Sequence, residues 1–316
     1  MTPDVTLDLE LSSASSSKER LPVKTHGSFF VPAALALIVL DANVTAQSAA
    51  PGAVRQEEPH VFALYPASKV IGLDLRNESE KDLGDIGDLL IETHSGEIRY
   101  AALDVGGFLG VGEDHRVVPW SLIRIVPDEK DADKCHARTS LTEQQVKAAP
   151  KCKVKERIDA DLEKSVDASF GKHESWAYDG KGGKGDAVLA WCSKMDGALL
   201  RDPASKDVGT VKHVILAPAN DCAAYAVIDT KKEAGNKLVA LPWSQIGFAY
   251  DGENKLVAST PIEIARFNSA PEYDSKDWKR MSSTAWMNEL STYYACDPFW
   301  KTPRFATAHP KPTEKQ

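Results

Sequence analysis

The sequence predicts a mainly β protein with short helices, in which a small closed β-barrel occurs twice in tandem and each barrel is followed by a short helix. Three observations support this fold class: an internal repeat, short apolar segments separated by turn residues, and a helix signal after each copy. Short strands with frequent turn signals favour a sandwich or a small barrel. Closing the sheet would also remove exposed strand edges from units this small.

The repeat relates two parts of the chain that lie about 125 residues apart. A shared glycine or a shared aromatic residue at equivalent positions indicates a common turn or common core packing rather than a binding site. The residues shared by the first and the second copy include Gly72 and Gly197, Gly84 and Gly209, Pro119 and Pro242, and Trp120 and Trp243.

Apolar and β-branched residues place four strands in the first copy and three in the second. Turn residues separate them at residues 94–96 and 218–221. The expected strands are residues 70–75, 84–91, 98–105 and 116–119 in the first copy and residues 208–216, 222–230 and 237–242 in the second.

A short helix is expected after each copy. Ser140 with Glu143, and Thr260 with Glu263, have the spacing of a capping box. In this motif the Ser or Thr side chain accepts the backbone N–H of the Glu, and the Glu side chain accepts the backbone N–H of the Ser or Thr. Each helix is expected to stop at an Ala-Pro pair, residues 149–150 and 270–271.

The first 46 residues have the order of a secretory signal peptide: basic residues, then an apolar run at residues 29–40, then small side chains before a cleavage point after Ala46. The apolar run is shorter than the roughly 20 residues that a membrane-spanning helix needs. We therefore expect export to the periplasm or the extracellular space. An uncleaved membrane anchor is the alternative.

The rest of the chain is divided by composition. Val154, Ile158, Leu162 and Val166 recur every four residues, which predicts an amphipathic helix between the copies. The expected segments are a signal peptide at 1–46, a linker at 47–61, barrel 1 at 62–127, a helical linker with a flexible tether at 128–185, barrel 2 at 186–258, a helical aromatic-rich segment at 259–302 and a disordered tail at 303–316.

Charge and motifs exclude several functions. The net charge of −8 disfavours nucleic-acid binding. The histidines are scattered without the i, i+4 spacing of a helical metal site, and no nucleophile motif occurs, so we expect no metal, no cofactor and no catalytic residues. Among the five cysteines, Cys135 and Cys152 flank one charged connection and are the best candidates for a disulfide.

Four stretches carry a family resemblance: residues 67–72, 84–91, 106–112 and 118–120. Together they resemble a PRC-barrel domain, closely over 62–127 and more loosely over 186–258, where the glycine-rich loop is missing. Such domains occur in the H subunit of photosynthetic reaction centres and in ribosome maturation factors. The resemblance implies a binding or assembly module without common catalytic residues.

We therefore expect a non-enzymatic, exported protein that binds another protein or itself. Phe108 and Leu109, at the tip of the glycine-rich loop, are the candidate partner contact, although they can also fold back over the barrel mouth. Two alternatives stay open: a membrane-anchored assembly factor related to the H subunit, and an enzyme with a site between the barrels.

Overall fold

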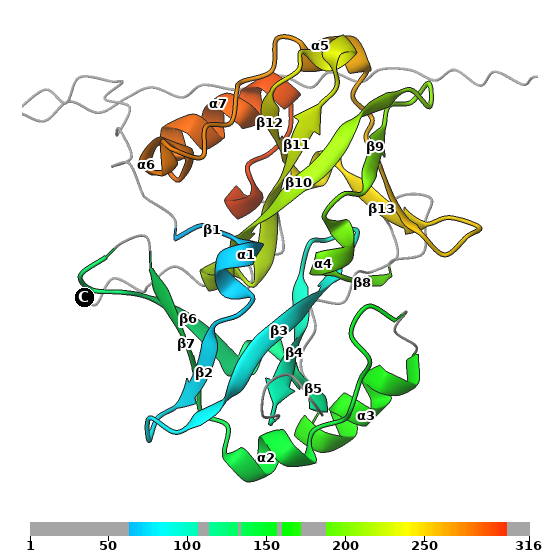
Figure 1. The fold of residues 1–316 in the computed structure, drawn as a ribbon. Coiled ribbons are helices and arrows are strands. Elements are labelled where there is room, and N and C mark those ends of the chain that lie inside the picture. Colours follow the sequence, from blue (N-terminus) through cyan, green and yellow to red (C-terminus); the bar gives the residue numbers. More distant parts are fainter. Residues whose placement is uncertain (1–62, 107–113, 132–133, 157–159, 172–187, 302–316) are drawn as a thin grey trace, which may run out of the picture. The chain divides into compact units, whose positions relative to one another are not determined.

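The computed structural model describes residues 63–106, 114–131, 134–156, 160–171 and 188–301. These residues form two sheets of seven strands each, with short helices around them (Figure 1). The mainly β fold class is confirmed.

Several expected features lie outside the described residues. They are the signal peptide at 1–46, the linker at 47–61, Phe108 and Leu109, the glycine-rich tether at 180–185 and the tail at 303–316.

Sheet 1 is built mainly from the first copy, with strands in the order β5-β4-β3-β2-β7-β6. Strand β2 pairs antiparallel with β3 and parallel with β7. The strands are β2 (Asp74–Asn77), β3 (Asp82–Glu92), β4 (Ile98–Val105), β5 (Asp114–Pro119), β6 (Ile123–Pro127) and β7 (Cys135–Thr139).

Sheet 2 repeats this arrangement with strands in the order β12-β11-β10-β9-β14-β13, so each pairing in sheet 1 has a counterpart. The parallel pair is β14 with β9. The strands are β9 (Leu199–Arg201), β10 (Asp207–Ala217), β11 (Cys222–Thr230), β12 (Leu238–Pro242), β13 (Gly247–Tyr250) and β14 (Leu256–Ser259).

Each sheet takes its seventh strand from the other copy. Strand β1 (Tyr65–Pro66), at the start of the first copy, pairs with β10 of sheet 2. Strand β8 (Leu189–Trp191), at the start of the second copy, pairs with β3 of sheet 1. Neither sheet is therefore complete from the residues of one copy.

The expectation that each sheet closes into a barrel is wrong. The end strands β5 and β6 do not pair, and a 3₁₀ turn, η1 (Trp120–Leu122), joins them instead. Pro119 ends β5 and has no N–H to donate to a further ladder. The segment around Pro150 covers the outer edge of β5. There the Val117 N–H donates to Pro150 O over 2.9 Å.

Sheet 2 has the same open end. Strands β12 and β13 are joined by the 3₁₀ turn η4 (Trp243–Gln245), and Tyr273 N–H donates to Leu238 O over 2.8 Å. An edge that is covered by a loop is protected from pairing with other chains, as closure would have protected it.

The strand expected at residues 70–75 begins instead as a helical turn, α1 (Ala67–Val70), and its counterpart is α4 (Cys192–Met195). Gly72 and Gly197 follow these turns with positive φ. Their N–H groups donate to Ile86 O and Val211 O over 2.7 and 2.8 Å, so the glycines return the chain to the sheet in the same way in both copies.

The helices after the copies differ from the expected capping boxes. In α2 (Glu143–Ala148) the cap is Thr142 with Gln145, rather than Ser140 with Glu143. Helix α5 (Ile264–Phe267) has no side-chain cap from Glu263, and the Asp202 carboxylate accepts the Ile264 N–H over 3.3 Å. The capping group came from a distant turn, which a local motif does not reveal.

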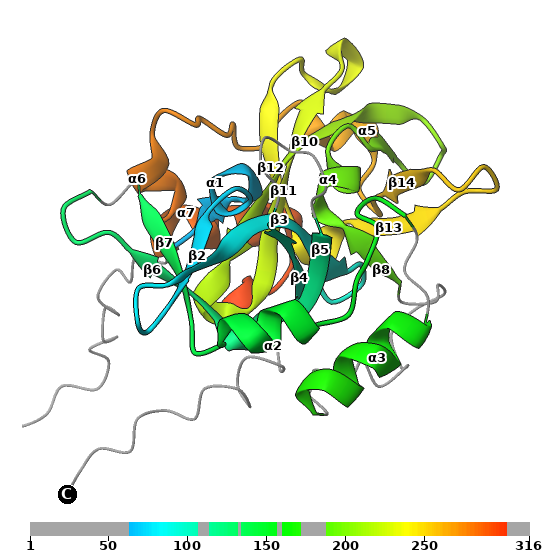
Figure 2. The ribbon, with the colours of Figure 1, turned by 60° about the horizontal axis from the view of Figure 1, so that its bottom comes forward.

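Longer helices cover the faces of the sheets. Helix α3 (Ala160–Phe170) lies beside α2 against β5 (Figure 2). Val166 of α3 is fully buried with Leu90 and Tyr100, as the amphipathic spacing predicts, but Val154 lies in a turn before the helix and not within it. The remaining helical segments are η2 (Pro218–Asn220), η3 (Lys232–Ala234), α6 (Trp278–Met281), α7 (Thr284–Tyr294) and η5 (Phe299–Lys301).

Helix α7 covers sheet 2 in a similar role. The rings of Trp286 and Tyr225 lie 5.9 Å apart, and Tyr225 occupies the position in β11 that Tyr100 has in β4. Tyr273 and Tyr294 are also buried, so much of the aromatic C-terminal segment packs on the sheet.

Gly84 and Gly209 share one steric constraint. A Cβ atom at Gly84 would collide with the carbonyl oxygen of Asp104, and one at Gly209 would collide with that of Asp229. The repeated glycine therefore lets neighbouring strands approach closely in both copies.

We predict that Gly209→Ala lowers the free energy of unfolding by about 1–3 kcal/mol, because the new methyl group overlaps backbone that cannot move alone. Gly247→Ala is the matched control: it is also a strand glycine, and its Cβ would meet only Ser259 Oγ at 3.6 Å. Urea unfolding of both variants measures the difference. Equal stabilities would contradict the steric argument.

Candidate functional site

The repeated Pro-Trp pairs lie at the same place in both copies. Pro119 and Pro242 end strands, and Trp120 and Trp243 begin the following 3₁₀ turns. Both indole rings are buried, with 1% and 3% exposure. They belong to the core and offer no surface to a ligand.

The loop end of the first copy carries an Asp–His pair. Asp104 Oδ1 lies 2.6 Å from His115 Nδ1, across the β4–β5 ladder next to the loop that holds Phe108 and Leu109. The Asp104 carboxylate lies against Gly87, where any Cβ would collide with it. Gly87 therefore makes room for a half-buried carboxylate at this end of the sheet.

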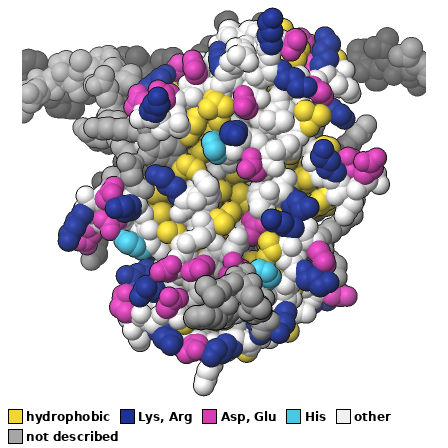
Figure 3. Space-filling view, in the orientation of Figure 1, with side chains coloured by type: hydrophobic (Ala, Val, Ile, Leu, Met, Phe, Trp, Pro, Cys, Tyr) yellow, Lys and Arg dark blue, Asp and Glu magenta, His cyan; other side chains and the backbone are white. Residues whose placement is uncertain are grey.

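Further carboxylates surround this pair. Asp85 and Asp74 are register partners on β3 and β2, and acidic side chains gather over these strands in Figure 3. Burial and the neighbouring carboxylates of Asp74, Asp82 and Asp104 raise the pKa of Asp85. Arg76 lies 3.4 Å from Asp74 and 4.0 Å from Asp82, so the loop end of the first copy has more carboxylates than cations but is partly paired.

The equivalent end of the second copy has different chemistry. Leu199 and Thr210 occupy the positions of Asp74 and Asp85. Asp207 pairs with Lys231 Nζ at 2.9 Å and with Arg201 Nε at 3.3 Å, and the exposed Asp229 keeps the position of Asp104. The hydrogen bond from Lys231 lowers the pKa of Asp207, in spite of partial burial.

The chain itself also covers this end of the second copy. The turn η3 lies against α5, and Asn268, which follows α5, donates from Nδ2 to Glu233 O over 3.3 Å. Lys237 Nζ donates to Asn268 O over 3.0 Å and to Ala270 O over 2.7 Å. The two loop ends therefore share a fold but not a surface.

A buried carboxylate lies where the two copies meet. Asp88 on β3 is fully buried, and its oxygens accept hydrogen bonds from Leu89 N–H, Ser193 N–H and Ser193 Oγ. Burial raises the pKa of Asp88, although these hydrogen bonds act in the other direction. Because Ser193 belongs to α4, Asp88 ties the start of the second copy to the sheet of the first.

The repeat places His213 on β10 at the position of Asp88. Burial lowers the pKa of His213, the nearby Asp196 raises it, and Lys212 lowers it further. The contact of β3 with α4 thus contains a buried acid, and the equivalent contact of β10 with α1 contains a half-buried imidazole. The spacing of the repeat was the signal that could have singled out both residues from the sequence.

The expected disulfide between Cys135 and Cys152 is not formed, and both residues remain thiols. Cys135 lies in β7 within the larger core cluster, whereas Cys152 packs against the separate cluster around Val166 and Trp191. Burial raises the pKa of Cys152 to about 12, which leaves it a poor nucleophile near neutral pH.

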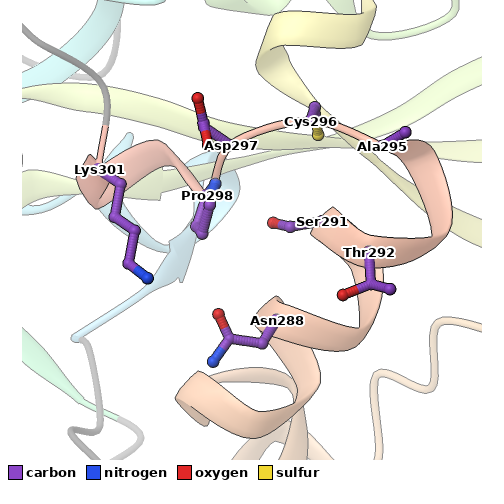
Figure 4. A pocket seen from close by; sticks show the side chains of 8 residues that line it. All are labelled: Asn288, Ser291, Thr292, Ala295, Cys296, Asp297, Pro298 and Lys301. Atoms are coloured by element: carbon purple, nitrogen blue, oxygen red, sulfur yellow. The ribbon is translucent and has the colours of Figure 1, made fainter.

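A polar pocket of about 440 Å³ lies at the end of α7 (Figure 4). Asn288, Ser291 and Thr292 line it from one face of the helix, and Lys301 lines it from η5. Figure 4 shows Lys301 and Asn288 directed toward the same space, whereas the Asp297 carboxylate points away from it. The pocket has the size and polarity for a small polar solute, and all its lining residues belong to the C-terminal segment.

Within the described ranges, no three His, Cys, Asp or Glu side chains gather as metal ligands would. None of the helices in this part of the chain combines the length and the apolar character needed to cross a bilayer.

Comparison with known families gives one match. Residues 63–134 and residues 197–261 each match the PRC-barrel domain. The two matched segments fall on the two structural copies. No curated protein matches the chain.

We predict that the stability of the wild type relative to Asp88→Asn increases as the pH falls from neutrality toward the ordinary Asp pKa of 3.8. The raised pKa means that the folded protein binds this proton more tightly than the unfolded chain does, so protonation favours the fold in that window. Asparagine keeps an acceptor for both N–H groups but carries no titratable proton.

Urea unfolding across that pH range measures the difference. Asp229→Asn, which makes the same replacement at an exposed position of β11, is measured alongside as the control. A stability difference between wild type and Asp88→Asn that stays constant with pH would contradict the assignment.

Proposed function

Residues 63–134 and 197–261 are two PRC-barrel domain segments, and from this premise we propose that the protein is a non-enzymatic, exported module for binding and assembly. In this proposal it acts by holding a protein partner at the loop end of its first copy. The family supports the general class of function. The specific surface is argued from the difference between the two copies.

The observation that carries the proposal is the divergence of two equivalent sheet ends. In the second copy, Lys231 adds a cation beside Asp207, and the chain around Asn268 covers this end. Arg201 is not part of this difference, because Arg76 lies beside Asp82 in the first copy. In the first copy, the same end has Asp74 and Asp85 in place of Leu199 and Thr210, and His115 lies against Asp104. The common fold explains the residues that the two copies share. The simplest reason for the different residues at their loop ends is that the first copy has a role that the second lacks.

The residues at the loop end of the first copy indicate what kind of partner it would bind. Phe108 and Leu109 stand in a loop whose flanking strands carry Asp104 and His115. Two apolar residues in the sequence between strands that carry acidic side chains match a protein that offers an apolar pocket with a basic rim, because apolar contact supplies affinity and charge complementarity supplies orientation.

Export rests on the N-terminal sequence. A basic stretch, an apolar run at 29–40 and Ala46 support translocation and cleavage.

We predict that the mature protein isolated from its native envelope begins at Gln47, immediately after the cleavage point. Mass spectrometry of the mature N-terminus tests this. A mature chain that retains residues 29–40 would contradict cleavage and favour the membrane-anchored alternative.

We predict that replacing Phe108 and Leu109 together by Ser reduces partner capture at least tenfold. Each buried apolar side chain contributes about 1.5–3 kcal/mol to a contact, and about 1.4 kcal/mol is a factor of ten in affinity. The measurement is cross-linking in the native envelope, followed by quantification of the cross-linked species.

The control variant is Val126→Ser, which removes an exposed apolar side chain on β6, at the opposite end of the strand order from β4 and β5. We expect Val126→Ser to leave capture unchanged. Equal capture by the loop variant and the control would overturn the proposed surface.

A further inference from the structure

The contact between the copies pairs a residue with its own equivalent. Glu97 and Cys222 face each other in an isolated antiparallel bridge. The spacing that separates Gly84 from Gly209 is the same spacing that separates Glu97 from Cys222. The bridge therefore joins position to identical position of the repeat, as happens on a twofold axis.

The hydrogen bonds around this bridge obey the same symmetry. Ile98 N–H donates to Asp221 O over 2.8 Å, and Ala223 N–H donates to Gly96 O over 2.8 Å. Ile98 and Ala223 are equivalent positions, and so are Gly96 and Asp221. Exchanging the two copies converts each bond into the other.

The exchanged strands show the symmetry a third time. In one join Tyr65 of β1 is paired with Leu216 of β10, and in the other Ala190 of β8 is paired with Ile91 of β3. Tyr65 and Ala190 are equivalent in the repeat, as are Leu216 and Ile91. Two strand additions in the same register do not follow from mere proximity along one chain.

A contact in which position i meets j and j meets i is isologous, the form that twofold homodimers use. We infer that the join is a homotypic dimer interface carried within one chain. Each copy is a binding module whose partner is another copy of the same fold, and joining the two in one chain supplies only proximity. This inference stands apart from the partner proposed for the loop end.

The residues at the axis also disfavour one alternative pairing. In a pair of two first copies, Glu97 would face a second Glu97. Glu97 is only 7% exposed, and like charges directly opposite on paired strands destabilise the contact. Pairing with the second copy places Cys222 there instead. The sequence thus favours the first copy with the second over the first copy with itself.

The contact between Gly96 and Trp243 across the join can be altered by one substitution, for which the chain offers a matched control. A Cβ at Gly96, in the β3–β4 turn of the first copy, would lie 2.7 Å from the ring of Trp243 in the second. Gly96 has φ +75°, and Gly197 has φ +77° with nothing within 4 Å of its Cβ position. Alanine at either site imposes similar backbone strain, but only Gly96→Ala adds a clash across the join.

The test is to place a protease site within residues 180–185 of the full chain, cleave it after folding and apply the product to size-exclusion chromatography. We expect both fragments to elute together at the position of the uncut protein. Fragments that elute separately would overturn the inference.

The two glycine variants report on the interface itself. In the cut protein, we expect Gly96→Ala to raise the dissociation constant of the fragments at least tenfold above that of Gly197→Ala. Equal dissociation constants would show that the fragments are held by something other than this join.

A third variant tests the register. The flanking hydrogen bonds make residues 97 and 222 a non-hydrogen-bonded pair, whose Cα atoms lie about 4.5 Å apart, within reach of a disulfide. Glu97→Cys, mildly oxidised and then cut, is expected to yield fragments joined by a reducible bond. The control with Cys222→Ser added should not. Absence of the bond in the single variant would overturn the pairing.

Discussion

The structure depends on one constraint: each copy must receive a strand from the other. Sheet 1 takes β8 and sheet 2 takes β1, and the central bridge between Glu97 and Cys222 lies between these two exchanges. Backbone groups that would be unpaired in an isolated copy are paired in the chain as a whole, and buried unpaired backbone groups are costly. Asp88 adds a side-chain tie by accepting hydrogen bonds from the first turn of α4.

Most strands could be predicted from the sequence because their signals are local. Alternating apolar residues and turn residues place β3, β4, β10 and β11 within one or two residues of their observed bounds. The equivalence of Gly84 and Gly209 is explained by one carbonyl contact in each copy. A repeat reveals such a constraint because the same close contact requires glycine at the equivalent position of both copies.

The features that sequence reasoning missed are those that depend on distant parts of the chain. Strands β1 and β8 are only two and three residues long and form by addition to a sheet built elsewhere. Asp202 caps α5 from a remote turn, and Cys135 and Cys152 lie in different core clusters although they are near in sequence. Sheet 1 does not close into a barrel: Pro119 ends β5, and the segment around Pro150 covers the edge of that strand. At the candidate site, the contrast between Asp85 and Thr210 was visible in the repeat, but their pairing with Asp74 and Leu199 was not.

The mutual completion of the two sheets can be tested with thiols that the chain already has. Cys135 lies in the first copy and Cys222 in the second, and both are buried. The most direct measurement is the rate at which each thiol is labelled in increasing urea, converted to a free energy of opening. Interlocked copies predict the same opening free energy and the same urea dependence at both positions. If one cysteine becomes reactive at a lower urea concentration than the other, the copies unfold independently and the account is wrong.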